Sequence, residues 1–260
     1  MSMLEITDYL TECVEKGRPV AFSKYGDGEY QCAVGCFGWN CDKDRYTHQL
    51  SCGVVESFKY MANNAENSFV GLWHNQEQRT YWDSIVDKPV KWANYHTILF
   101  DKNNEDQKIK LYKAIKMSKM NKIIICNDLL IKSKFLFDAR SLVHVPFNNW
   151  YDSQFNSILD YIKQLIESSN NPPLIITCCG MNAKVLICEL YKAFPAGIYL
   201  DFGSALDLIC TKRDSRGREY DYDYLRDLLQ DILPDNWESE KWNSIYEQAR
   251  YKMGVHMGDV

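Results

Sequence analysis

The sequence has little that would direct the protein to a membrane or to a nucleic acid. No stretch of the 260 residues approaches the roughly 18 uninterrupted apolar residues of a membrane span. Residues 1–16 carry several acidic side chains and lack the basic start and apolar run of a signal peptide. Lys and Arg total 30 against 35 Asp and Glu, so the formal net charge of -5 offers no general attraction to phosphate backbones. We therefore expect a cytoplasmic protein with no transmembrane segment and no nucleic-acid partner.

Cysteine pairs with the CxxC spacing are also missing. The chain has 10 cysteines but no CxxC pair, and structural zinc sites usually contain one. A zinc site among Cys32, Cys36, Cys41 and Cys52, which lie in one region, is the less favoured alternative. Other cysteines lie in or beside apolar runs, where a free thiol behaves as a small buried hydrophobe; these are Cys126, Cys178, Cys179 and Cys188. The pattern favours reduced core thiols in a cytosolic protein.

Short apolar runs alternate with amphipathic segments of helical length. Hydrophobic residues make up 46% and charged residues 25% of the chain, which is typical of a globular protein. Strands are predicted at residues 20–23, 69–72, 97–100, 122–126, 142–145, 174–178 and 197–200. Helices are predicted at residues 5–16, 50–61, 105–117, 153–166 and 182–193. This alternation predicts an α/β fold, a Rossmann-like and mostly parallel sheet with helices on both faces.

We expect a single domain over residues 1–260. The α/β core should span about residues 18–220, because strand signals fade beyond that point. The remaining residues, about 221–260, predict a helical C-terminal extension that caps the sheet. Its first helix is expected from Tyr224 to Ile232, and its second from about Glu238 to Tyr251, after Pro234.

The most informative motif is Asp27-Gly28-Glu29, which directly follows an apolar strand. Carboxylates two positions apart on a turn can converge on one hard cation, and ligands of open α/β sheets bind beyond the carboxyl ends of the strands. Mg²⁺ or Mn²⁺, held by few carboxylates and several phosphate oxygens, is the expected metal. A plain solvated turn is the alternative, since acidic glycine turns are common.

A dinucleotide-binding fingerprint is a competing interpretation of the same segment. Gly26 and Gly28 follow a strand as the first two glycines of that fingerprint do, but Gln31 stands in place of the third. A carboxylate at the centre of a phosphate-binding turn would also repel a pyrophosphate unless a cation lay between them. The metal-site interpretation accounts for these residues better.

Several segments together resemble the GT-D type glycosyltransferases, a family long classed as a domain of unknown function. The similar segments are FSKYGDGEY at residues 22–30, NCDKDRY at 40–46, LIITCCGMNA at 174–183, DFGSALD at 201–207, and Ser215-Arg216. They follow the order of the family and span most of residues 20–220. In that family the aspartate and glutamate of a DxE motif bind the divalent cation that holds a UDP-sugar, which the resemblance implies for Asp27 and Glu29.

The resemblance also implies a nucleotide-sugar site. Its expected residues are Lys24, Tyr25, Gly26, Asp42, Arg45, Tyr46, Gly180, Ser204 and Arg216. Lys24 stands where an arginine is frequent in the family, so it keeps the charge but not the bidentate fork. Gly180 lies between a strand and a helix, where backbone N–H groups can receive an anion; tight packing is the alternative there.

Asp201 and Asp207 are the candidate catalytic bases. They flank a Gly-Ser turn at the end of a strand, and in a parallel sheet they lie on the same edge as Asp27. Asp207 is the first candidate, because it matches a family motif and should lie at the edge. Helix capping is the alternative role, particularly for Asp201.

The combined pattern predicts a metal-dependent glycosyltransferase. A hexosyl or pentosyl group would pass from a nucleotide diphosphate donor, a UDP-sugar, to a hydroxyl of a glycan or glycoconjugate acceptor. A catalytically inactive sugar-nucleotide or partner-binding module on the same fold is the main alternative, because fold alone does not establish activity. A Rossmann-type oxidoreductase or methyltransferase is disfavoured by the missing third glycine.

Overall fold

A seven-stranded sheet forms the centre of the protein, and every strand pair in it is parallel. The computed structural model describes residues 3–64, 66–73, 75–102 and 104–239. In these residues the strand order is β3-β2-β1-β7-β6-β4-β5. The strands are β1 (Val20–Tyr25), β2 (Ser68–Leu72), β3 (Trp92–Asn94), β4 (Asn121–Cys126), β5 (Ser141–His144), β6 (Pro173–Cys178) and β7 (Ile198–Asp201).

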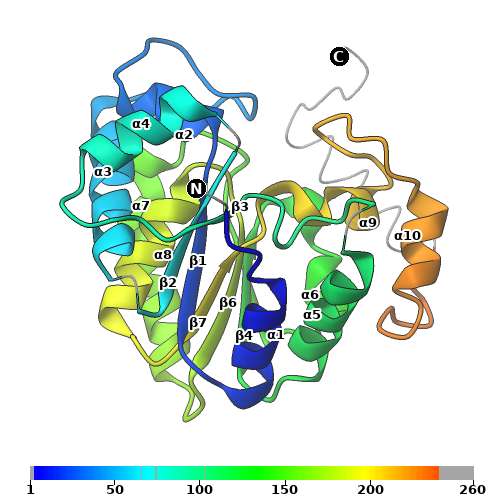
Figure 1. Ribbon diagram of the computed structural model, residues 1–260. Helices are drawn as coiled ribbons and strands as arrows, with labels where there is room; N and C mark the ends of the chain where they lie inside the picture. Colours follow the sequence, from blue (N-terminus) through cyan, green and yellow to red (C-terminus); the bar gives the residue numbers. More distant parts are fainter. Residues whose placement is uncertain (1–2, 65, 74, 103, 240–260) are drawn as a thin grey trace.

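Helices cover both faces of the sheet. The longer ones are α1 (Thr7–Lys16), α3 (His48–Asn63), α4 (Gln76–Ser84), α5 (Glu105–Met117), α7 (Tyr151–Glu167) and α8 (Asn182–Ala193). Short ones are α2 (Asp27–Ala33), α6 (Ser133–Leu136), α9 (Asp207–Thr211), α10 (Tyr222–Leu228) and the 3₁₀ helices η1 (Asp128–Leu130) and η2 (Gly203–Leu206). Figure 1 shows α3, α7 and α8 on one face and α1, α5 and α10 on the other. The expected α/β, Rossmann-like architecture is therefore confirmed.

The two faces hold separate hydrophobic clusters because side chains alternate along each strand. In β1, Val20 and Phe22 belong to the cluster beneath α1 and α5, whereas Ala21 and Tyr25 belong to the cluster beneath α3 and α8. All six residues of β1 are buried. A parallel strand covered on both faces therefore reads as a nearly continuous apolar run, which made β1 recognisable in the sequence.

One predicted strand is wrong. Residues 97–100 form no strand; the sheet instead gains its edge strand β3 a few residues earlier. Ile98, Leu99 and Phe100 are nevertheless buried in the cluster that includes residues of α1 and α5. Their apolar character thus reflects side-chain packing in an irregular segment, and periodicity alone does not separate that case from a short buried strand.

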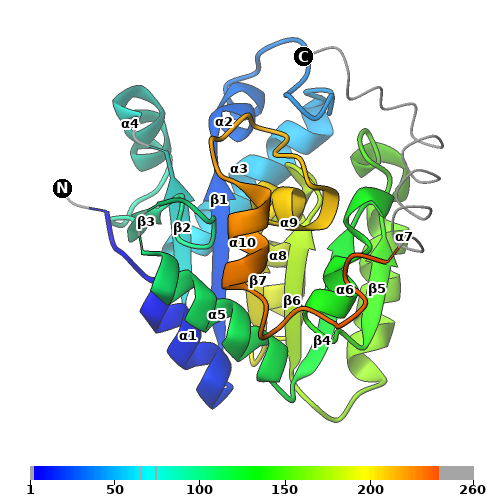
Figure 2. The ribbon, with the colours of Figure 1, turned by 90° about the vertical axis from the view of Figure 1, so that its right-hand side faces the viewer.

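The chain after α9 packs across the face that carries α1 and α5 (Figure 2). Leu225 of α10, and then Leu229, Ile232 and Trp237, join the same hydrophobic cluster. The first predicted helix of the extension corresponds to α10, which ends earlier than expected. The second, expected for residues 238–251, lies almost entirely outside the described residues. None of the described helices is long and apolar enough to cross a membrane.

The order of the strands brings the carboxyl ends of β6 and β7 next to that of β1. From β1 the chain proceeds to β2 and β3 on one side, then to β4 and β5 on the other, and returns through β6 and β7 to pair with β1 again. The carboxyl ends of β1, β6 and β7 thus lie side by side where the strand order changes direction. Open α/β sheets bind their ligands at this kind of position.

Candidate functional site

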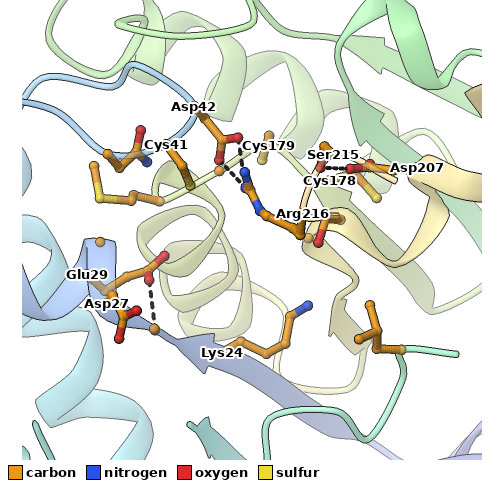
Figure 3. Close-up of a pocket in the computed structure, with 18 of the residues that line it drawn as sticks. Lys24, Asp27, Glu29, Cys41, Asp42, Cys178, Cys179, Asp207, Ser215 and Arg216 are labelled. Atoms are coloured by element: carbon orange, nitrogen blue, oxygen red, sulfur yellow. Dashed lines mark hydrogen bonds and ion pairs between the residues drawn. The ribbon is translucent and has the colours of Figure 1, made fainter. Parts of the chain in front are cut away.

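A cavity of about 360 Å³ opens at the carboxyl edge of the sheet. Its walls come from the segments that follow β1, β6 and β7 and from two loops, at residues 40–42 and 213–218. In Figure 3, Asp27 and Glu29 lie on one side of the cavity and Asp207 and Ser215 on the other. The cavity therefore gathers most of the residues singled out in the sequence.

Asp27 and Glu29 belong to the first turn of α2, where a turn was expected. Gly26 is the N-cap, and the Glu29 Oε2 atom accepts a 2.8 Å hydrogen bond from its backbone N–H, the reciprocal contact of a capping box. Asp27 is exposed, and its Oδ1 atom accepts a 2.5 Å hydrogen bond from Gln78 Nε2. Both carboxylates line the cavity and sit at the helix end that favours negative charge.

Lys184 lies in the cavity wall, and no sequence motif identified it. Only 5% of the residue is exposed, and its Nζ atom lies 2.8 Å from Glu29 Oε1 and 3.1 Å from Asp201 Oδ2. Burial disfavours the charged form, but Asp201 and Glu29 outweigh it and hold the Lys184 pKa well above its ordinary value. The only local sign of this role is a lysine in the otherwise apolar first turns of α8.

Asp201 does not reach the cavity. It is 0% exposed, pairs with Lys184, and its Oδ2 atom also accepts a 3.0 Å hydrogen bond from the backbone N–H of Lys24. A base must contact the proton it removes, and this carboxylate is enclosed by protein. We therefore revise its expected role from candidate base to buried counter-ion of Lys184.

Lys24 brings a second buried ammonium to the cavity. Its Nζ atom donates a 2.7 Å hydrogen bond to the Phe202 carbonyl and lies 5.2 Å from the centre of the Tyr95 ring. Burial lowers the Lys24 pKa to about 8, although Asp201 opposes the shift. Gly203, at φ +53°, approaches this ammonium so closely that a Cβ would lie 2.8 Å from Nζ. The positive φ and this close approach both favour glycine there.

Two loops meet across the cavity through Asp42 and Arg216. One terminal nitrogen of Arg216 lies 2.8 Å from each carboxylate oxygen of Asp42. Arg218, from the same loop as Arg216, donates to Asp214 at 2.5 Å and to the Ser204 carbonyl at 3.0 Å. Arg216 and Arg218 both line the cavity, so cationic groups face the carboxylates of α2.

Asp207 is the first residue of α9 and lines the cavity as expected. Its Oδ2 atom accepts a hydrogen bond from the Ser215 hydroxyl (Figure 3). Burial raises the Asp207 pKa to about 6, against the lowering effects of Ser215 and the neighbouring Arg216. A carboxyl with this pKa changes its protonation state close to neutral pH, which suits a general base.

Three residues expected in the nucleotide-sugar site do not line the cavity. Tyr25 is buried, and its hydroxyl hydrogen-bonds Ser57. Tyr46 bonds Gln31 through its hydroxyl, and Arg45 is exposed on the surface. The three residues are close in sequence to residues that line the cavity, but their own side chains point away from it. These three assignments are corrected.

The remaining expected residues line the cavity, namely Lys24, Gly26, Asp42, Gly180, Ser204 and Arg216. Gly180 has φ +64°, and a Cβ there would lie 2.8 Å from the Oδ2 atom of Asp44. Asp44 is itself buried and accepts a 2.9 Å hydrogen bond from the backbone N–H of Asn149. The close approach to Asp44 favours the packing role for Gly180, the alternative left open above.

The residues present fit a divalent cation shared with a ligand. In the described part of the chain no three His, Cys, Asp or Glu side chains gather into a metal site. Asp27 is nonetheless exposed at the cavity, and the buried Glu29 lies beside it with Oε1 facing Lys184 and Oε2 accepting from the Gly26 N–H. Two carboxylates supply the hard oxygen ligands that Mg²⁺ and Mn²⁺ prefer, while phosphate oxygens and water complete the shell.

These features define an α/β protein with a charged ligand cavity at the switch point of its sheet. No family model and no curated protein matches the sequence. A solved structure described as a new glycosyltransferase (DUF1792) from Streptococcus sanguinis is similar, with 20% identity, a TM-score of 0.57, and coverage of 80% of this chain and 83% of that chain.

A second solved structure, of the highly conserved domain of unknown function 1792, is described as having a distinct glycosyltransferase fold. It shares 14% identity and a TM-score of 0.56, over 92% of this chain and 94% of that chain. A selenomethionine-substituted structure of the domain of unknown function 1792 shares 14% identity and a TM-score of 0.53, over 91% of this chain and 96% of that chain. The chain therefore has the fold of the DUF1792 glycosyltransferases, which agrees with the resemblance found in its sequence.

Proposed function

We propose that the protein is a metal-dependent glycosyltransferase. It would transfer a hexosyl or pentosyl group from a nucleotide diphosphate donor, a UDP-sugar, to a hydroxyl of a glycan or glycoconjugate. The observation that carries the proposal is the meeting of Asp27 and Glu29 with Lys24, Arg216 and Arg218 around one cavity. A diphosphate bound by a divalent cation is the kind of ligand that needs both charge types at once.

Each group has a distinct role in this proposal. Asp27 and Glu29 would hold Mn²⁺ or Mg²⁺, which supplies Lewis-acid stabilisation of the negative charge on the departing nucleotide. Lys184 would hold the Glu29 carboxylate in position, since its Nζ atom lies 2.8 Å from Oε1. Arg216 and Lys24 would bind phosphate oxygens. Asp207 would accept the proton of the acceptor hydroxyl if transfer inverts the anomeric centre.

Hydrolysis of nucleotide sugars tests the proposed activity most directly. Many glycosyltransferases slowly transfer their sugar to water, so a screen of nucleotide sugars with and without Mn²⁺ should show one donor consumed only with the metal. A protein that binds a nucleotide sugar in the same screen but never consumes it would instead be the inactive binding module considered above.

Donor binding should depend on the metal. Asp27 and Glu29 would otherwise face phosphate oxygens of like charge, so we expect UDP to bind at least about tenfold more tightly with Mn²⁺ than with EDTA. Calorimetry in the two buffers measures the difference, with uridine as the control because it has no phosphate for a cation to bridge. Equal affinity for UDP in both buffers would reject the metal role.

Arg216 should contribute to donor affinity. Hydrogen bonds to charged groups typically contribute about 1.5–3 kcal/mol, so Arg216→Gln is expected to weaken UDP binding by roughly tenfold or more in the presence of Mn²⁺. Arg45→Gln is the matched control, because Arg45 carries the same charge but does not line the cavity. A similar loss in both variants would point to net charge as the cause, and no loss in either would remove Arg216 from the site.

A further inference from the structure

A second cavity, of about 560 Å³, adjoins the first at the ends of β2 and β3. Trp73, Tyr95 and His96 line both cavities, and we call these three residues the aromatic wall. We propose that the second cavity is the subsite for the nucleoside of the donor, with its base stacked on the aromatic wall. This inference rests on the proposed function and assigns it a region that no sequence motif covers.

The aromatic wall offers an accessible ring surface. Trp73 is 46% exposed, although it directly follows a strand whose five residues are all buried. Its ring centre lies 5.4 Å from that of Tyr95 and 4.7 Å from that of His96. An exposed indole that packs against two other rings and lines a cavity has the properties of a stacking surface for a planar ligand.

The wall is fixed to the proposed phosphate site. A Cβ on Gly26 would lie only 3.3 Å from the Tyr95 hydroxyl, and the Lys24 ammonium lies 5.2 Å from the Tyr95 ring centre. Asn94 supports the next position, since its Oδ1 atom accepts a 2.9 Å hydrogen bond from the backbone N–H of His96. A base stacked on this wall would therefore lie next to the region of Lys24, where the phosphates are proposed to bind.

The polar groups of the second cavity suit a nucleoside better than a second phosphate. It contains two carboxylates, Glu5 and Asp101, against one lysine, Lys108, which pairs with Asp101 at 2.8 Å. Carboxylates accept hydrogen bonds from ribose hydroxyls, as they do in dinucleotide-binding folds. Asn104 also lines the cavity, and its side chain does not cap α5, so an amide with both donors and acceptors is present for a base edge.

The opposite end of the site is left for the acceptor. Asp207 lies across the first cavity from Asp27 and Glu29 in Figure 3, on the side of Arg216 and Ser215. If the nucleoside occupies the β2–β3 end and the phosphates the region of Lys24, the donor sugar extends toward Asp207. Asp207 does not line the second cavity, so an acceptor bound there would not contact the proposed base, and this arrangement favours the nucleoside there.

The test compares Trp73→Ala with two controls. Base stacking on an aromatic side chain contributes about 1–3 kcal/mol, so Trp73→Ala should weaken UDP binding between about fivefold and 150-fold in calorimetry with Mn²⁺. Trp73→Phe should retain most of the affinity. Trp39→Ala should bind normally, because Trp39 is 65% exposed but lines neither cavity.

Inorganic pyrophosphate separates stacking from damage to the phosphate site. It carries no base, so wild type and Trp73→Ala should bind it equally with Mn²⁺. Unchanged UDP affinity in Trp73→Ala, or an equal loss of affinity for UDP and pyrophosphate, would overturn the nucleoside assignment. Unchanged UDP affinity together with a raised acceptor KM would show that the aromatic wall binds the acceptor. Failure of wild type to bind UDP at all would reject the proposed function itself, which is a different result.

Discussion

Replacing Asp27 by asparagine is expected to reduce glycosyl transfer by roughly 10²–10³-fold, the scale seen when one charge-stabilising group is removed from an active site. The amide keeps the shape of the side chain and an oxygen that can still accept from Gln78. It removes a full negative charge from the proposed metal site, which weakens both cation retention and leaving-group stabilisation. The loss should therefore appear in the transfer rate and in donor affinity together.

The fold should tolerate this substitution. Asp27 is exposed and lies in the first turn of α2, where its charge interacts favourably with the helix dipole by about 0.3–1 kcal/mol. The melting temperature without ligand should consequently fall only slightly. The increase in melting temperature on adding UDP and Mn²⁺ should shrink, because ligand stabilisation follows affinity.

Glu77→Gln provides the matched control for Asp27→Asn. Glu77 is also an exposed acid in the first turn of a helix, α4, but it does not line the cavity. It should keep wild-type transfer and the full ligand-induced shift in melting temperature. If Asp27→Asn kept both as well, Asp27 would be a helix-terminal residue only, and the proposed mechanism would lose its main support.

Most helices and strands could be predicted from the sequence because each depends on a local pattern of apolar and polar residues. Helices α5 and α8 begin and end where the periodicity predicted, at Glu105, Met117, Asn182 and Ala193. The two glycines of the segment that begins at Gly26 indicate a turn, whereas the structure has the first turn of α2 there. Glycine is an accepted N-cap residue, and a glutamate three residues after the N-cap can make one half of a capping box, so Gly26 and Glu29 also give a local signal for the start of α2.

The pairings within the site could not be predicted in the same way. Lys184 contacts Glu29 across 155 positions of the chain, and Arg216 contacts Asp42 across 174. Such contacts depend on which strands become neighbours, and the composition of each segment does not specify that. Asp201 and Asp207 show the same limit: Asp201 is the last residue of β7 and Asp207 lies six positions later, but only Asp207 lines the cavity.

Replacing Asp207 by asparagine is expected to reduce transfer by about 10²–10⁴-fold, the usual effect of losing a general base. Donor binding should stay nearly intact, because Asp207 lies on the opposite side of the cavity from Asp27 and Glu29 (Figure 3). The asparagine oxygen can still accept from the Ser215 hydroxyl, so the local loop contact is retained. Transfer kinetics together with UDP calorimetry separate the two effects.

The pH dependence identifies the group more specifically. Because Asp207 has a pKa of about 6 and a base must be ionised, wild-type transfer should fall as pH decreases through about 6 and be level between that value and about 8, where Lys24 begins to lose its charge. The Asp207 pKa is raised above its value of 3.8 in an unfolded chain, so its contribution to stability is largest at low pH and is lost as pH rises through about 6. At pH 7, Asp207→Asn should therefore not reduce the free energy of unfolding through this group.

A second carboxyl group, that of Asp44, would titrate in the same pH range as Asp207, so the experiment has to distinguish the two. Burial also raises the Asp44 pKa to about 6, but Asp44 is buried against Asn149 and does not line the cavity. Asp44→Asn should therefore keep the fall in transfer below pH 6, whereas the residual activity of Asp207→Asn should lose it. Near wild-type turnover in Asp207→Asn, or a pH profile that follows Asp44, would show that another group accepts the proton of the acceptor hydroxyl.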